Sequence, residues 1–231
     1  MNLSKKNILL ISFILISIIY GFVYVNDSMM NEYTSNSLIS LLIFIYYFLL
    51  GAYYIVGSKK KNTLFLLALF SAFLGDLLFF NNVSFILGLV FFLFFILMNM
   101  LILTKKIGEI KIATFFISII PFLLILIIVL SLFFTNVGML KLLFLIYGSA
   151  LGLYASFSLY FYLKAKSNVA LINLIGILFF ITATVLRGLR ESEGDSTTYK
   201  LLNIIFFTIS LVLITNAYII SDNEQIKDKK E

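Results

Sequence analysis

The chain has 231 residues, of which 62% are hydrophobic and 12% are charged, and its net charge is +6. About a quarter of the residues of a soluble domain are charged, so this composition excludes a soluble fold. The absence of cysteine and histidine excludes disulfides, thiol nucleophiles, Cys/His zinc sites and Ser-His-Asp catalysis. We therefore expect no cofactor and no metal, and any chemistry must use carboxylate, hydroxyl, amide, Lys or Arg groups.

The sequence predicts an all-α polytopic membrane bundle. A helix crosses the roughly 30 Å hydrocarbon layer in about 20 residues. Eight apolar segments of suitable length follow one another: Ile8–Val25, Leu38–Val56, Thr63–Phe80, Val83–Leu103, Ile112–Phe134, Leu142–Leu163, Val169–Leu189 and Leu201–Ile220. The first lacks a small-residue cleavage site, so we expect it to stay as an anchor. We expect one bundle domain over 1–220 and a charged cytoplasmic tail over 221–231.

The positive charges predict the orientation of these eight segments. Thirteen of the seventeen basic residues fall on the side that holds both termini, and the other four are Lys141, Arg187, Arg190 and Lys200. Cytoplasmic loops carry the excess of Lys and Arg, so both termini should be cytoplasmic. In a membrane protein this pattern explains the basic excess, and we expect no nucleic-acid partner.

One acid lies well inside an apolar segment: Asp76, in LFSAFLGDLLFF. The helical face through it is made mostly of small residues: Ala68, Ser71, Ala72, Gly75, Asp76 and Phe79. Small residues at this spacing let a second helix approach closely, so Asp76 should point into the bundle. An ionisable group there is a functional-site hypothesis by default, and we assign Asp76 as the catalytic acid or base. The alternative is a structural ion pair, or an aspartate bonded to a neighbouring hydroxyl.

The expected counter-charge of Asp76 is Arg187, near the outer end of Val169–Leu189. Both residues lie at a similar depth on the outer side. The same helical face carries Thr184, one turn before Arg187. The alternative for Arg187 is that its long side chain extends to water at the membrane boundary.

Several other polar or small residues have structural interpretations. The face Gly148, Gly152, Ala155 and Ser156 is typical of a helix-packing seam. The tyrosines of the second segment fit anchoring at the membrane interface: Tyr46, Tyr47, Tyr53 and Tyr54. Interhelical hydrogen bonds are expected from four further side chains: Asn99, Thr208, Thr215 and Asn216. Pro121 is the only proline and is expected to kink its helix.

The stretch LFLLALFSAFLGDLLFF, followed by FILGLVFF, resembles the YhhN family of eight-span membrane proteins. The resemblance rests on three short patterns: Ser71, Gly75 and Asp76; Phe85 and Gly88; Gly176 and Phe180. Members of that family are associated with lysoplasmalogenase activity, the hydrolysis of the vinyl ether bond of lysoplasmalogens. The resemblance implies such a hydrolase, with Asp76 as its catalytic residue and Arg187, Ser71 and Thr184 as substrate-binding residues.

The chain departs from the family pattern at two places. Where the family often has a histidine, this chain has Ile96. Where it has a Ser-Asp pair, this chain has Ala183 and Thr184. One of two expected intramembrane acids is therefore missing, which puts hydrolysis in doubt even within the family.

Two further functions therefore stand beside the hydrolase: a non-catalytic protein that binds or carries a lipid or small amphiphile, and a structural role. The expected partners are membrane lipids and a lipid-like substrate or ligand. The family likeness favours the cytoplasmic (inner) membrane of a bacterium. The oligomeric state is left open.

Overall fold

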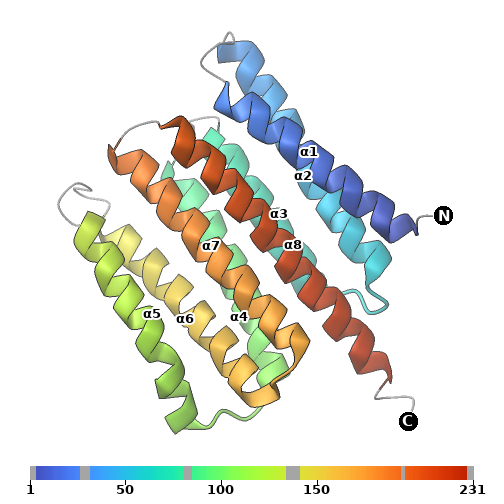
Figure 1. Ribbon diagram of the computed structural model, residues 1–231, viewed down its shortest axis with the longest axis vertical. Helices are drawn as coiled ribbons and strands as arrows, with labels where there is room; N and C mark the ends of the chain where they lie inside the picture. Colours follow the sequence, from blue (N-terminus) through green and yellow to red (C-terminus); the bar gives the residue numbers. More distant parts are fainter. Residues whose placement is uncertain (1–3, 27–31, 81–84, 134–140, 194–195, 228–231) are drawn as a thin grey trace.

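The computed structural model describes residues 4–26, 32–80, 85–133, 141–193 and 196–227. Each of the eight expected segments forms a helix in it, as Figure 1 shows. The helices are α1 (Lys5–Val25), α2 (Glu32–Gly57), α3 (Thr63–Phe80), α4 (Phe85–Ile107), α5 (Ile112–Phe133), α6 (Lys141–Ala165), α7 (Asn168–Glu193) and α8 (Thr197–Lys227). Two of the expected end residues, Val83 and Phe134, lie outside the described residues.

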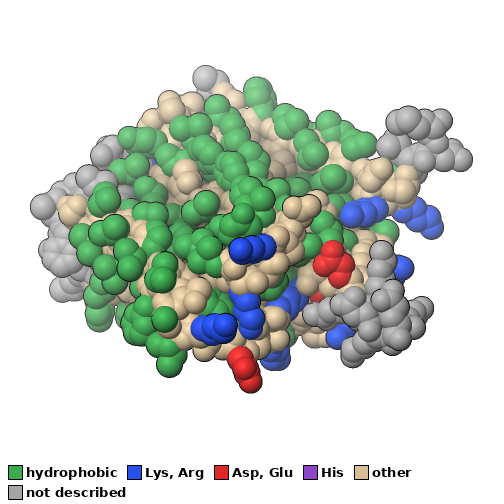
Figure 2. Space-filling model, turned by 60° about the horizontal axis from the view of Figure 1, so that its bottom comes forward, with side chains coloured by type: hydrophobic (Ala, Val, Ile, Leu, Met, Phe, Trp, Pro, Cys, Tyr) green, Lys and Arg blue, Asp and Glu red, His purple; other side chains and the backbone are tan. Residues whose placement is uncertain are grey.

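Seven of the described helices are long and apolar enough to cross a membrane: all except α6. In α6, which has 25 residues, serines, tyrosines and glycines interrupt the apolar run. It nevertheless runs through the bundle beside α4, α5 and α7 (Figure 1). Apolar side chains cover much of the face seen in Figure 2. The prediction of an all-α polytopic membrane bundle is confirmed.

Seven helices form a closed ring, in the order α1, α2, α3, α4, α6, α7 and α8, with α8 packing back on α1. Contacts between α2 and α8 cross the ring and separate α1 from its main interior. The remaining helix, α5, lies outside the ring, where it packs on α6 and less extensively on α7. The main interior is therefore bounded by six helices and closed on one side by α2.

The glycines of the family-like patterns lie where two helices approach most closely. A methyl group added at Gly75 would come within 2.7 Å of the Phe92 ring, between α3 and α4. At Gly176 it would lie 2.9 Å from the Ile214 side chain and 3.2 Å from the Ile214 backbone nitrogen, between α7 and α8. These glycines fix the spacing of the two helix pairs, since atoms under about 3.5 Å apart would have to move.

The prediction that the α2 tyrosines anchor at the membrane interface is wrong. All four are buried, at most 6% exposed, and their hydroxyls point into the bundle. Tyr46 bonds to Thr208 at 3.3 Å and Tyr53 to Asn216 at 3.0 Å, both on α8. The hydroxyls turn inward because α8 and α3 offer them polar partners, and a buried hydroxyl without one is costly.

Those two contacts confirm the interhelical hydrogen bonds expected from α8. The Asn99 side chain instead donates to the Phe95 carbonyl of its own helix. In the described part of the chain, the buried Thr215 hydroxyl has no hydrogen-bond partner.

Both ends of the chain lie at the same end of the bundle in Figure 1. Lys and Arg side chains gather toward one part of the face in Figure 2. Which side of the membrane this end faces stays a prediction.

The helix α8 continues beyond the boundary that the sequence predicts for the tail. Residues 221–227 are helical, and Asp222 is only 3% exposed. Its carboxylate is held by Tyr54 and Lys106, so Asp222 itself stays packed against the bundle.

Candidate functional site

A charged pair inside the bundle joins Asp76 to Arg187. Asp76 lies one turn before the end of α3, and it is 3% exposed. Its Oδ2 accepts a hydrogen bond from the Tyr47 hydroxyl at 2.7 Å, and its Oδ1 accepts one from Nη2 of Arg187 at 3.1 Å. The predicted pairing is confirmed. The carboxylate thus links α2, α3 and α7.

Arg187 points into the bundle, where three phenylalanines surround its guanidinium group. The Cζ atom lies 4.8 Å from the ring centre of Phe79, 5.2 Å from that of Phe92 and 5.7 Å from that of Phe207. Cations within about 6 Å of a ring face are attracted by its quadrupole. This cage from α3, α4 and α8 replaces part of the lost hydration. The alternative of a side chain extended to water is therefore wrong, although 18% of the side chain is exposed.

A small, partly open cavity of about 30 Å³ lies next to Arg187. Most of its wall is apolar, and the polar residues on it are Arg187, Tyr147, Thr184 and Asn203. Asp76 is not among the lining residues. Arg187 therefore lies between the Asp76 carboxylate and the cavity, and it would separate the carboxylate from any molecule bound there.

The other two predicted site residues differ in position. Thr184 lines the cavity, and its hydroxyl donates to the Phe180 carbonyl at 2.9 Å within α7. Ser71 is buried on α3, 7% exposed, and is not among the residues that line this cavity. It lies about 7.5 Å from Asp76 along the helix axis. The structure thus brings Asp76 and Arg187 together, places Thr184 beside Arg187, and leaves Ser71 away from the cavity wall.

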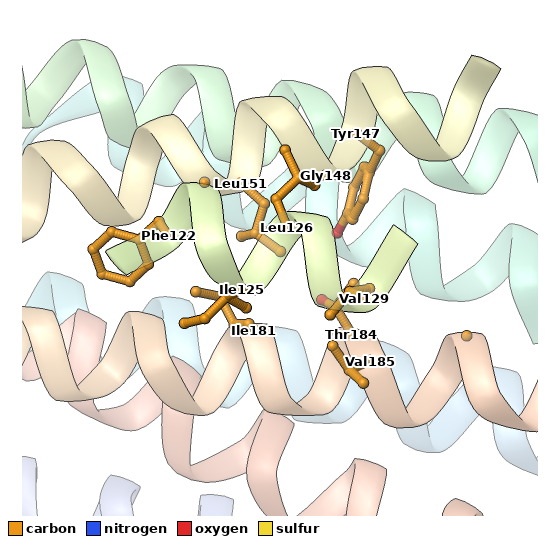
Figure 3. Close-up of a pocket in the computed structure, with 12 residues that line it drawn as sticks. Phe122, Ile125, Leu126, Val129, Tyr147, Gly148, Leu151, Ile181, Thr184 and Val185 are labelled. Atoms are coloured by element: carbon orange, nitrogen blue, oxygen red, sulfur yellow. The ribbon is translucent and has the colours of Figure 1, made fainter. Parts of the chain in front are cut away.

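A second, more apolar cavity, of about 70 Å³ and partly open, lies between α5, α6 and α7 (Figure 3). Aliphatic and aromatic side chains of the three helices point into it. Gly148 and Gly152 of α6 lie on its wall, so the predicted seam faces α5. A methyl group at Gly152 would lie 4.0 Å from the Phe122 side chain, an ordinary van der Waals contact, so it would fit there.

A second buried aspartate lies at the opposite end of the bundle. Asp222 accepts a hydrogen bond from the Tyr54 hydroxyl at 2.7 Å and pairs with Lys106 at 3.5 Å. The Ser58 hydroxyl lies 3.3 Å from the same carboxylate. This cluster ties α8 to α2 and α4. It was missed because Asp222 follows the last apolar segment, where charged residues are usually solvated.

The sequence also missed Tyr47 and the three cage phenylalanines. One signal was available for Tyr47. It lies seven residues before Tyr54, so the two tyrosines share one face of the helix and should point the same way. Phe79 was named on the helical face of Asp76, but not as a neighbour of Arg187. Phe92 and Phe207 gave no signal, because the 26 phenylalanines are spread through every segment.

The groups available for chemistry are one carboxylate, one guanidinium and several hydroxyls. Within the described residues, no three acidic side chains gather in a way that would hold a metal ion. A carboxylic acid can give or take a proton, and a guanidinium can bind a phosphate or carboxylate through paired hydrogen bonds. The site therefore suits acid–base chemistry or the binding of an anionic amphiphile.

Comparison with protein-family models gives one match, to the model described as the YhhN family, over residues 31–218. The match includes α2 to α7 and most of α8, and so both Asp76 and Arg187. Searches of curated proteins and of solved structures found no match.

Proposed function

This chain belongs to the YhhN family, and on that premise we propose that it is a membrane hydrolase of the vinyl ether bond of lysoplasmalogens or a related lipid. The observation that carries the proposal is the buried Asp76 carboxylate, held by Tyr47 and Arg187 beside a cavity within the bundle. Both residues fall inside the matched region.

The reaction needs one proton donor and one water molecule. Asp76, as the carboxylic acid, gives its proton to the carbon of the vinyl ether that lies farther from the oxygen. The resulting oxocarbenium ion is stabilised by the carboxylate that remains. Water adds to the cationic carbon and returns a proton to Asp76. The hemiacetal then separates into an aldehyde and the free glycerol hydroxyl, so that one water is consumed for each bond broken.

Arg187 must move for this step to occur. With Arg187 donating to Oδ1 and Tyr47 donating to Oδ2, the carboxylate of Asp76 is stabilised relative to the acid that must give the proton. A lipid phosphate in the cavity would offer Arg187 a second anionic partner, and the side chain already lines that cavity. In this proposal, head-group binding turns Arg187 away from Asp76 and opens the carboxyl group to the vinyl ether.

A second candidate, a non-catalytic binder or carrier of a lipid or small amphiphile, is favoured by a specific observation. Of the three positions at which the family often has further polar groups, two are apolar here and fully packed: Ile96 is 0% exposed and Ala183 is 1% exposed. The third, Thr184, has a hydroxyl in place of a carboxylate. Ala183 also lines the cavity beside Arg187. A binder needs only Arg187 and the cavity, and it leaves Asp76 as the fixed partner that positions the guanidinium.

The deciding experiment measures aldehyde release from a lysoplasmalogen by the purified protein and by Asp76→Asn. Each protein is first shown to be folded by its thermal melt. Turnover by the wild type and its loss in a folded Asp76→Asn variant support the hydrolase. A folded wild type that binds the lipid and releases no aldehyde supports the binder instead.

A further inference from the structure

We propose that the apolar cavity between α5, α6 and α7 holds the hydrocarbon chain of a single-chain lipid whose phosphate lies at Arg187. The identity of the lipid rests on the proposed function. The new element is the position of its hydrocarbon chain. Three observations support it: the two cavities share part of their walls, the second one is apolar along its length, and it borders the helix outside the ring.

The two cavities meet at three residues. Tyr147, Thr184 and Gly188 line both the cavity beside Arg187 and the cavity under α5. In Figure 3 the side chains of Tyr147 and Thr184 lie at the same end of the apolar cavity. The two cavities are thus separated by a shared wall, and a molecule with a polar head and an apolar tail would cross it beside Gly188, which has no side chain.

The polarity of the second cavity and the length of its walls suit the part of a lipid chain next to the head group. On α7 its wall runs from Ile181 to Gly188, and on α5 from Phe122 to Val129. Seven residues of helix span about 10 Å, a third of the roughly 30 Å hydrocarbon layer. The polar end lies toward the end of α7 that carries Arg187, and the apolar part extends toward the middle of the membrane. A lipid in that leaflet has the same orientation.

The position of α5 gives such a lipid direct access. This helix lies outside the ring and contacts only α6 and α7 among the described helices. Its outer face is apolar and exposed, as expected for a surface in contact with lipid; Ile117 is 61% and Ile128 is 58% exposed. A lipid chain can thus reach the cavity at the edge of α5 without any separation of the ring helices.

A groove between α2 and α3 is the competing location. Tyr47 lies on its wall together with apolar residues such as Phe44, Phe70 and Phe73. It has no lining residue in common with the cavity beside Arg187. It approaches Asp76 only through the Tyr47 side chain, so a chain in this groove would leave its phosphate away from Arg187.

Two matched substitutions separate the two locations. Gly152→Leu places a side chain into the α5–α6–α7 cavity, where a new Cβ would lie 4.0 Å from Phe122 and so meet no clash. Gly51→Leu does the same in the α2–α3 groove, where nothing lies within 4 Å. The probe is a lysophospholipid with a photoreactive diazirine near the end of its chain. Cross-linked peptides are mapped by mass spectrometry, with and without excess unlabelled lysophospholipid, on variants that melt like the wild type.

We expect cross-links to α5 and α7, around Leu126 and Ile181, and we expect excess unlabelled lipid to suppress them. These cross-links should be lost in Gly152→Leu and should persist in Gly51→Leu. Suppressible cross-links in the α2–α3 groove, lost in Gly51→Leu, would overturn the inference, and so would the absence of any suppressible cross-link. Aldehyde release is measured separately. Cross-links in the α5–α6–α7 cavity without aldehyde release would support the proposed site of the lipid chain and contradict the hydrolase. Aldehyde release together with cross-links in the α2–α3 groove would support the hydrolase and contradict the proposed site of the chain.

Discussion

Tyr47 and Tyr54 lie two helical turns apart on α2, and each donates a hydrogen bond of 2.7 Å to a buried aspartate, Asp76 for the first and Asp222 for the second. Each aspartate also pairs with a cation, Arg187 at 3.1 Å and Lys106 at 3.5 Å. One helix therefore holds two clusters of the same composition at opposite ends of the bundle. Only the Asp76 cluster has its cation on the wall of the cavity described above, so the other cluster is a natural control.

The first prediction compares the two aspartates. Asp76→Asn and Asp222→Asn should each destabilise the protein by about 3–5 kcal/mol, because each leaves a buried cation without its partner. Only Asp76→Asn should also reduce aldehyde release, by roughly 10²–10⁴-fold, the usual contribution of a general acid. The measurement is turnover per folded molecule, with folding followed by thermal melt. Equal losses of turnover in both variants would mean that Asp76 acts through stability alone.

The second prediction concerns the coupling of Asp76 to Arg187. The double variant Asp76→Asn/Arg187→Gln should be less destabilised than the sum of the two single variants, because the second change removes the charge that the first left unpaired. A double-mutant cycle of thermal melts measures this coupling. Pairing Asp76→Asn with Lys106→Gln gives the control cycle, which should be additive because Lys106 pairs with Asp222 at the other end. Additivity in both cycles would contradict a direct ion pair.

The third prediction tests the hydrogen bond from Tyr47. Tyr47→Phe keeps the ring in place and removes the donor to Oδ2 of Asp76. We expect a loss of about 1.5–3 kcal/mol of stability, as for a hydrogen bond to a charged group. Tyr53→Phe, whose hydroxyl contacts the neutral Asn216, should cost only about 0.5–1.5 kcal/mol. If the two variants melted at the same temperature, the Tyr47 bond would have no special weight.

The fourth prediction concerns the close contact of α7 with α8. Gly176→Ala should destabilise the protein by about 1–3 kcal/mol, since the new methyl group meets the Ile214 backbone, which cannot rotate away. Gly51→Ala, in open space on α2, should be neutral or stabilising by up to about 1 kcal/mol, because alanine favours the helix. Thermal melts of the two variants provide the comparison. A harmless Gly176→Ala would show that α7 and α8 are less closely packed.

The fifth prediction tests the orientation. The chain has no cysteine, so a single introduced thiol reports its own side of the membrane. Lys60→Cys and Lys111→Cys, at the lysine-rich end, should react with a membrane-impermeant maleimide only after the cells are opened. Thr198→Cys, an exposed position at the other end, should react in intact cells. The opposite pattern would place both termini outside.

The number of helices and their approximate positions could be predicted from the sequence, because they follow from the lengths of the apolar segments. Apolar length alone gave eight helices, and α3 has the predicted bounds of Thr63–Phe80. The helix ends are less certain, because polar residues extend a helix when something holds them, as Tyr54 and Lys106 hold Asp222 in α8. Nothing in the local sequence of α8 indicates those partners, which lie on α2 and α4.

The site was predictable where it depends on charge and depth. Asp76 and Arg187 are the ionisable residues at matching depth, and the low polarity around them leaves each little choice of partner. The tyrosines were misread because an amphipathic ring suits both the interface and a buried hydrogen bond. Which of these occurs depends on the facing helix, and the sequence of α2 does not contain that information.

The inward tyrosines also determine how the molecule sits in bilayers of different thickness. Ten of the thirteen tyrosines are buried, and the chain has no tryptophan, so few aromatic rings remain to hold it at the level of the lipid phosphates. The lysines at one end are then the main anchor. In a thinner or thicker bilayer that end keeps its level, and the mismatch falls on the opposite end. That is the end where Arg187 and the two cavities lie, so lipid composition alone changes how deeply they sit below the surface.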